Sequence, residues 1–247
     1  RIWAVKSFDD AGNMTMDQFM CALDWIAAHA ATLEVASMSF ILEGTVDGTC
    51  GRVTRTYLFG LIKRQVLVDP YHQAVCRIVR SGTVVVAAAG NFAQDTATYL
   101  PAAYPQTIAV SALADHDGLP GGIAADDACY VGEIDDGLAS FSNFGSDVDI
   151  AAPGICLTST APGGAYAFGD GTSFSTPLVA GGAALVASRE PLADAARIRA
   201  VLLGRPGHQF PRHDQRFLVG EGDPPSQFER AIGRQQPERA DHRADDD

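Results

Sequence analysis

The sequence predicts an α/β fold, with a mostly parallel sheet and helices on both faces. Strand-like and helix-like segments alternate along most of the first 204 residues, which is typical of sheets built from strand–helix–strand units. Apart from Thr83, residues 83–89 are all apolar, as expected for a parallel strand buried on both faces. With 247 residues, of which 47% are hydrophobic, the chain is long enough for one such domain.

The first expected elements are an apolar strand over residues 2–8 and, after a turn, a helix. Thr15 and Gln18 have the spacing of a capping box, so this helix should begin there and reach about Ala31. The domain is expected to span residues 1–204. Further strands are expected at 34–40, 83–89, 107–112 and 148–151, and further helices at 70–81, 175–188 and 193–203.

Residues 205–247 are expected to extend beyond that domain. From about residue 220 the chain is rich in Glu, Asp, Arg, Pro and Gln and poor in large apolar residues. Such a segment buries too little apolar surface to offset the entropy lost on folding, so disorder is expected there. We assign no chemistry to this extension.

The overall charge narrows the range of partners. The formal net charge is −12, whereas a surface that neutralises phosphates needs clustered basic residues, so no nucleic-acid partner is expected. No apolar run approaches the roughly 18 residues of a transmembrane helix, so no membrane partner is expected either.

Residues 171–177, Gly-Thr-Ser-Phe-Ser-Thr-Pro, precede a run of small apolar residues. Ser173 is thereby placed at the start of a helix, near the unsatisfied N–H groups and the positive end of the helix dipole. A developing oxyanion would be stabilised there, so the position suits a nucleophile. The structural alternative is that Ser173 is only an N-cap, for which serine is a preferred residue. Pro177 lies early enough for its missing N–H to remove little from the helix.

Asn91 follows the apolar strand 83–89 through Gly90. This order places Asn91 at the carboxyl end of a parallel sheet, the edge where open α/β sheets bind ligands. The alternative is a plain turn, which a Gly-Asn pair most often forms.

The segments around Asn91 and Ser173 resemble the subtilisin-like serine peptidases, in which Gly-Thr-Ser-x-x-x-Pro carries the nucleophile and Ala-Ala-Gly-Asn carries the oxyanion-hole asparagine. The resemblance implies a serine endopeptidase that hydrolyses peptide bonds through an acyl-enzyme on Ser173. It also implies that Asn91 and the backbone N–H of Ser173 hold the oxyanion. Further similar segments follow in order at 100–105, 108–112, 139–145 and 148–154.

By the same resemblance, the substrate site would be shaped by Ser39, Phe40, Ala88, Ala89, Gly90 and Thr172. Ala88, Ala89 and Gly90 correspond to the wall of the S1 pocket, where small side chains leave room for a large substrate residue. The segment at 39–40 corresponds to the edge that pairs with the substrate backbone. Phe40, Ile41 and Leu42 put bulk where the family has a glycine, so we expect a poorer substrate fit on that side.

The aspartate and histidine motifs of the family do not occur in this chain. Its members carry the aspartate in an Asp-Thr/Ser-Gly turn and the histidine in a His-Gly-Thr-His helix start. Residues 1–6 resemble the strand that follows the histidine helix, so the domain is expected to lack its amino-terminal portion. The chain alone is then expected to be close to inactive, because Ser173 has no base. The alternative is a catalytically inactive, subtilisin-like binding protein.

No replacement base is expected among the histidines of the chain. None of them lies in a Gly-rich helix start like that of the family's histidine. They are His29, His72, His116, His208, His213 and His242.

The expected partners are a protein or peptide substrate and a propeptide or missing amino-terminal portion. No cofactor is required, and no metal ligand set is predicted. The pairs Asp126–Asp127 and Asp135–Asp136 could contact calcium. Calcium needs about six to eight oxygens held together, so solvated loop charge is expected instead.

The resemblance implies two disulfides among the five cysteines. Cys50 and Cys76 correspond to one pair in some secreted relatives, and Cys129 with Cys156 to a second pair. Two disulfides indicate an oxidising, extracellular location, with any signal peptide outside this chain. The alternative is that all five thiols are reduced and buried. Cys21 is left unpaired and is expected in the core.

Residues 52–68 are an insertion relative to those relatives. The segment carries Arg52, Arg55, Lys63 and Arg64, with no acidic residue before Asp69. We expect an added surface loop, with a small interaction element as the alternative.

Overall fold

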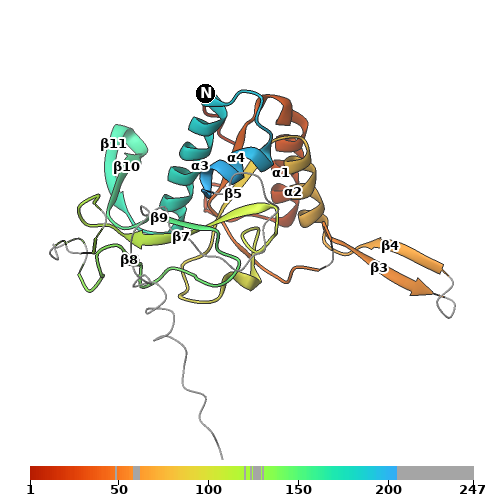
Figure 1. Cartoon of the computed structure of the whole chain (residues 1–247), viewed down its shortest axis with the longest axis horizontal. Coiled ribbons are helices and arrows are strands. Elements are labelled where there is room, and N and C mark those ends of the chain that lie inside the picture. Colours follow the sequence, from red (N-terminus) through yellow and green to blue (C-terminus); the bar gives the residue numbers. More distant parts are fainter. Residues whose placement is uncertain are drawn as a thin grey trace, which may run out of the picture.

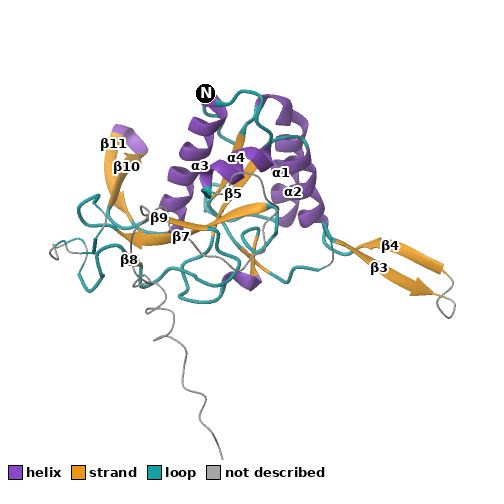
Figure 2. Cartoon of the chain, in the orientation of Figure 1, coloured by secondary structure: helices purple, strands orange, loops and turns teal. Residues whose placement is uncertain are grey.

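The computed structural model describes residues 1–47, 49–57, 62–119, 121–122, 124, 129 and 131–204. In this part of the chain, the central sheet has four parallel strands in the order β1 (Val35–Met38), β5 (Val84–Ala88), β7 (Thr107–Ala114) and β9 (Ile150–Pro153) (Figures 1 and 2). A short strand, β8 (Gly137–Leu138), pairs antiparallel with the end of β7. The predicted mostly parallel α/β fold is confirmed, and its four central strands lie where the sequence predicts them.

Helices cover both faces of this sheet because successive apolar side chains of a strand point to opposite faces. Val85 and Ala87 of β5 belong to a core cluster with the first two helices, whereas Val84 and Val86 belong to a cluster with the last two. All residues of β5 are buried, as a parallel strand between two helical layers requires. The helices are α1 (Met16–His29), α2 (Pro70–Arg80), α3 (Thr172–Arg189) and α4 (Ala195–Leu202) (Figure 1).

Side-chain caps fix where the first two of these helices begin. The predicted capping box is present, since Thr15 Oγ1 accepts from Gln18 N at 3.3 Å and Gln18 Oε1 accepts from Thr15 N at 2.7 Å. Asp69 caps α2 by accepting from the backbone N–H groups of Tyr71 and His72, both at 3.0 Å. Each cap satisfies backbone donors that have no partner within the helix.

The remaining short elements lie around the sheet. β2 (Leu42–Glu43) pairs with β6 (Tyr99–Leu100), and β10 (Leu157–Ala161) forms a hairpin with β11 (Ala165–Gly169). Three short 3₁₀ helices occupy Ala30–Thr32, Thr96–Thr98 and Pro162–Gly164.

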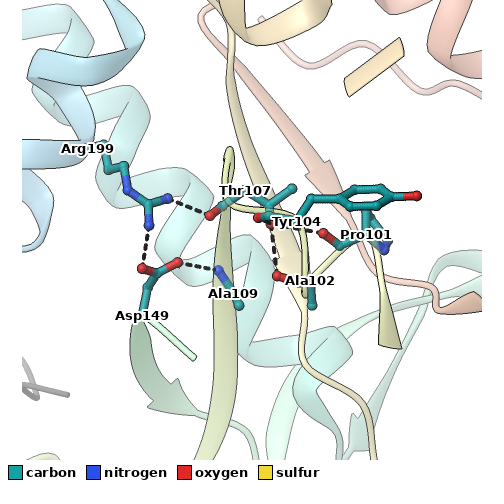
Figure 3. Close-up of polar contacts among 7 residues, drawn as sticks. All are labelled: Pro101, Ala102, Tyr104, Thr107, Ala109, Asp149 and Arg199. Atoms are coloured by element: carbon teal, nitrogen blue, oxygen red, sulfur yellow. Dashed lines mark hydrogen bonds and ion pairs between the residues drawn. The ribbon is translucent and has the colours of Figure 1, made fainter. Parts of the chain in front are cut away.

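The amino-terminal edge of the sheet is closed by a polar network (Figure 3). Arg199 of α4 forms an ion pair with Asp149 and donates to the carbonyl of Thr107, at the start of β7. Asp149 also accepts from Ala109 N at 3.0 Å. The Thr107 hydroxyl contacts three carbonyl oxygens within 3.0 Å, those of Pro101, Ala102 and Tyr104. These contacts anchor α4 to two strands of the sheet.

The predicted strand at residues 2–8 is wrong. The segment has no regular structure, Ile2 is fully exposed, and Trp3 lies with its ring centroid 6.1 Å from that of Trp25 on α1. A strand needs a neighbour to complete its hydrogen bonds, and among the described residues β1 pairs only with β5. Residues 2–8 do not pair with the open edge of β1, so their apolar pattern forms no strand.

The segment 52–68, expected as a loop, instead contains a β-hairpin. β3 (Arg52–Tyr57) pairs antiparallel with β4 (Ile62–Leu67) in continuous register. The hairpin projects away from the body of the molecule in Figure 1. The extension at 205–247, with its predicted disorder, lies outside the described residues.

Both disulfides implied by the resemblance are present. Cys50 is bonded to Cys76 and Cys129 to Cys156, with Cα–Cα distances of 5.8 and 6.1 Å. Cys21 is free, as predicted, but it is exposed on α1 rather than part of the core. In the described part of the chain, no helix is both long and apolar enough to cross a membrane.

Candidate active site

The end of one strand and the start of one helix meet at the carboxyl-terminal edge of the sheet. β5 ends at Ala88 and continues through Gly90 to Asn91, and α3 begins close by at Thr172. Gly90 has φ +113°, and a Cβ there would lie 2.4 Å from Asn143 Nδ2. Only glycine fits this turn, because an L side chain would be both strained and in collision.

Ser173 lies inside the first turn of α3, not before it. The sequence predicts a helix start at residue 175, whereas α3 starts at Thr172 with Gly171 as its N-cap. The N-cap alternative for Ser173 is therefore wrong. Its half-buried hydroxyl lies 3.5 Å from the Ser39 carbonyl oxygen, at the long limit of a hydrogen bond. Ser173 Oγ is thus held only weakly by the protein.

Asn91 is bound to the residue that precedes Ser173. Asn91 Oδ1 accepts from Thr172 N and from Thr172 Oγ1, both at 2.9 Å, and Thr172 Oγ1 accepts from Gly90 N at 3.2 Å. The oxygen half of the amide is thereby occupied, while Asn91 Nδ2 has no partner among the described residues. A Cβ at Gly171, which has φ +139°, would lie 3.1 Å from Nδ2. Asn91 therefore links β5 to α3 and keeps donors available beside the helix start.

Asn143 forms hydrogen bonds with the backbone on both sides of Asn91. It is fully buried, its Oδ1 accepts from Phe92 N at 2.9 Å and Gln94 N at 3.2 Å, and its Nδ2 donates to Ala89 O at 2.9 Å. Sequence analysis gives Asn143 no role of its own. A buried asparagine that satisfies distant backbone groups has no local signature, and only the Ser-Asn turn at 142–143 hints at it.

Pro177 costs α3 one hydrogen bond, and Ser39 replaces it. As the sixth residue of the helix, Pro177 lacks the N–H that would otherwise donate to the carbonyl of Ser173. Ser39 Oγ donates to Ser173 O at 3.1 Å instead. The expectation that Pro177 takes little from the helix is therefore wrong in detail, and the freed carbonyl ties Ser173 to the end of β1.

The other predicted substrate residues lie around these groups. Ala88, Ala89 and Thr172 are buried and Ser39 is exposed. The Phe40 ring packs edge-on against Phe19 of α1, with centroids 5.0 Å apart, and Leu42 also packs on the same core cluster. Much of the bulk noted at residues 40–42 is thus taken up by the hydrophobic core.

The histidines that the structure describes contact other residues of the fold. His29 Nδ1 lies 2.8 Å from the Trp25 carbonyl, and the buried His72 pairs with Gln106 Oε1 at 2.7 Å while stacking on Tyr104. His116 lies in the loop after β7, where its backbone N–H donates to Asp135. His208, His213 and His242 lie outside the described residues.

In the loop after β7, two acidic side chains accept hydrogen bonds from backbone N–H groups. Asp135 is buried and accepts from His116 N at 2.9 Å and Ala124 N at 2.8 Å, while Asp136 accepts from two glycine N–H groups. Carboxylate oxygens of Asp115, Asp117 and Asp135 lie within 4.8 Å of one another. The expectation of solvated charge is wrong for Asp135, and Asp126 and Asp127 lie outside the described residues.

Comparisons with known proteins identify the family of the chain. A model described as the subtilase family matches residues 1–218. Subtilisin NAT from Bacillus subtilis subsp. natto is 32% identical over 201 residues, covering 80% of this chain and 42% of that protein. A thermophilic serine proteinase from Bacillus sp. (strain AK1) is 35% identical over 189 residues, covering 76% of this chain and 36% of that protein. The chain thus spans less than half the length of these two relatives.

A solved structure described as a cold adapted subtilisin-like serine proteinase is similar in fold. Its TM-score is 0.57 at 24% identity, and the match covers 81% of this chain and 58% of that one. Because the family model extends over most of the residues, the chain belongs to the subtilase family.

Proposed function

We propose that the chain is the serine-bearing part of a serine endopeptidase that hydrolyses peptide bonds through an acyl-enzyme on Ser173. The observation that carries this proposal is the pair of 2.9 Å hydrogen bonds from Thr172 to Asn91 Oδ1. They bring the asparagine amide next to the nucleophile and leave its Nδ2 donors unused by the described residues. The weak contact of Ser173 Oγ with the protein also suits a group that must attack a substrate carbonyl.

In this proposal, Asn91 Nδ2 and the backbone N–H of Ser173 stabilise the oxyanion. The Ser173 N–H belongs to the first turn of α3, where backbone N–H groups lack intrahelical acceptors. Both donors stand ready before the reaction and need no rearrangement when charge develops on the carbonyl oxygen. Asn143 and Gly90 act as positioning residues, since they hold the turn that carries Asn91.

We propose that a base must be supplied from outside these 247 residues. His29 and His72 are bound to Trp25 and Gln106, and neither triad motif of the family is found in the sequence. A serine hydroxyl without a base is a poor nucleophile at neutral pH. The chain by itself is then close to inactive, and the missing aspartate and histidine would orient and deprotonate Ser173 in the active enzyme.

The substrate would be an extended protein or peptide segment that lies along Ser39 and Phe40, with a side chain beside Ala88, Ala89 and Gly90. Ser39 also contacts the Ser173 backbone, so substrate pairing and nucleophile position are coupled there. The two disulfides support a secreted protein, since such bonds persist in oxidising compartments. Calcium and other cofactors have no assigned role.

A fluorophosphonate probe tests the proposal, with imidazole added as an external base. Without imidazole, the purified chain should leave casein intact and label slowly. With imidazole, Ser173 should label faster, and Ser173→Ala should not label, whereas the exposed control Ser159→Ala should behave as wild type. Asn91→Asp keeps the oxygen that accepts from Thr172 and loses the donors. In subtilisin itself, losing one such donor costs about 100-fold or more in rate, and a loss of that order is expected here.

Each outcome of this experiment bears on one part of the proposal. Fast casein turnover without imidazole would refute the missing base. Labelling that neither responds to imidazole nor depends on Ser173 would refute the nucleophile and favour the inactive binding protein.

A further inference from the structure

The hairpin formed by β3 and β4 has an unusual charge for this protein. Residues 49–68 contain four basic residues and no acidic residue, while the whole chain has a net charge of −12. Arg52 lies at the base of the hairpin, where its guanidinium meets the side-chain amide of Gln73, with that amide oriented to accept. The remaining basic groups, Arg55, Lys63 and Arg64, are exposed and form no ion pair with a described residue.

The register of the hairpin places two arginines directly opposite each other. Arg55 is paired with Arg64, so both side chains lie on the same face, and Lys63 lies on the other face opposite Thr56. Like charges in opposite positions destabilise a strand pair. A hairpin of two strands is also only marginally stable by itself in water. The hairpin therefore carries an electrostatic cost that an acidic partner would remove.

The same face carries apolar side chains on both sides of the arginine pair. Tyr57 and Ile62 lie beyond it toward the tip, 44% and 41% exposed, and Val53 and Val66 lie toward the base. This order, apolar then basic then apolar, matches an extended segment in which a carboxylate is flanked by apolar residues. Arginine binds carboxylates in a bidentate manner, which makes the pair a specific receptor rather than a diffuse charge.

The base of the hairpin is fixed to the body of the protein. The Cys50–Cys76 disulfide joins its first residues to α2, and Val68 N donates to Gly51 O at 2.8 Å. A Cβ at Gly51 would lie 1.9 Å from the Asp69 carbonyl oxygen, so the backbone is closely packed there. A fixed base therefore carries exposed strands that project from the body of the molecule (Figure 1).

We propose that this hairpin docks an acidic, extended segment of a partner protein, which adds as a third strand and places a carboxylate at Arg55 and Arg64. Among the described residues, each strand of the hairpin forms a ladder only with the other, apart from an isolated bridge between Thr49 and Arg52. Backbone groups on both outer edges are therefore available beyond Arg52. A sulfated polysaccharide could neutralise the arginines but supplies no backbone hydrogen bonds and does not use the apolar positions. The docking is independent of Ser173.

Fluorescence anisotropy with the full chain tests the docking. The probe is a labelled seven-residue peptide with a central glutamate, valine two positions before and two positions after it, and threonine at the other positions, so that glutamate and valines share one face. A second probe carries backbone N-methyl groups on alternate residues. Arg55→Gln with Arg64→Gln should weaken binding of the first probe about tenfold, as expected for two exposed charge-assisted contacts. The control, Lys63→Gln with Arg189→Gln, removes the same charge from the other face of the hairpin and from α3, and it should change binding by less than about twofold. N-methylation on the pairing edge should abolish binding.

Two further measurements keep the test decisive. Arg55→Lys with Arg64→Lys retains the charge and should still lose about threefold, because lysine cannot bind in a bidentate manner. A heparin oligosaccharide serves as the other class of ligand. Tighter binding of heparin than of peptide, no effect of N-methylation, or equal binding by the Arg55/Arg64 and control variants would overturn the proposal.

Discussion

The two edges of the central sheet use their polar groups in opposite ways. At the amino-terminal edge, Arg199, Asp149 and Thr107 bind one another or nearby backbone groups (Figure 3). At the carboxyl-terminal edge, Ser173 Oγ has one contact of 3.5 Å, and Asn91 Nδ2 has no partner among the described residues. The same strands thus end in a closed network on one side and in available groups on the other. The first edge stabilises the fold, and the second is free to bind a ligand.

The largest loss of stability is expected from a substitution at Asn143, which supports the carboxyl-terminal edge of the sheet. Asn143→Ala would leave Phe92 N, Gln94 N and Ala89 O without their side-chain partner in a buried site. The free energy of unfolding should fall by about 3 kcal/mol or more, given the cost of unsatisfied buried groups. Urea unfolding followed by circular dichroism measures this. Asn13, an exposed asparagine in the turn before α1, provides a matched control. Asn13→Ala should lower the free energy of unfolding by less than about 1 kcal/mol.

Next in size is the loss of the amino-terminal network. Asp149→Ala removes the ion partner of Arg199 and the acceptor of Ala109 N, and should cost about 2 kcal/mol of stability. Labelling of Ser173 in the presence of imidazole should not change, because that edge lies at the other end of the strands. Asp24→Ala breaks a more exposed ion pair with Arg77 and should cost less than about 1 kcal/mol. Equal losses for the two variants would mean that the network does not stabilise the fold.

A pH effect is expected at Tyr104, whose carbonyl belongs to the same network. Burial, followed by its 2.8 Å hydrogen bond to Asp69 and the charge of that residue, raises the pKa of Tyr104. The folded state therefore favours the neutral phenol, so stability is fully present below the unfolded pKa of about 10 and is lost as the pH rises above it. Between about pH 9 and 11, wild type should lose about 1 kcal/mol more than Tyr104→Phe. Parallel pH profiles of the two proteins would contradict this.

The smallest stability effect is expected at the nucleophile itself. Ser173→Ala should change the free energy of unfolding by less than about 0.5 kcal/mol, since only a 3.5 Å contact is lost. The same substitution should remove all specific labelling. A destabilisation as large as that of Asp149→Ala would show that Ser173 is a structural residue, and the contrast between the two edges would fail.

Local signals in the sequence explain what could be predicted. The capping box at Thr15 and Gln18, the apolar strand β5 and the turn at Gly90 each depend on neighbouring residues, and each is present. The strand expected at residues 2–8 depends on a partner strand, which no local pattern reveals. Sequence analysis does not reveal the role of Asn143 for the same reason, because its partners lie about 50 residues away along the chain.

The hairpin shows a different limit of sequence analysis. Its composition indicated exposure, and this is correct for nearly all of β3 and β4. Its strand pairing was missed, since alternating basic, polar and apolar residues on an exposed segment do not distinguish a loop from a ribbon. The register of Arg55 opposite Arg64 became visible only in the structure.

The central claim is that Ser173 Oγ and Asn91 Nδ2 serve the same substrate atom. A crystal structure of the fluorophosphonate adduct, formed on Ser173 with imidazole present, tests it directly. The account predicts a phosphonyl oxygen at about 3 Å from both Asn91 Nδ2 and Ser173 N. An adduct whose oxygens all point away from Asn91, with the Thr172–Asn91 hydrogen bonds intact, would contradict it.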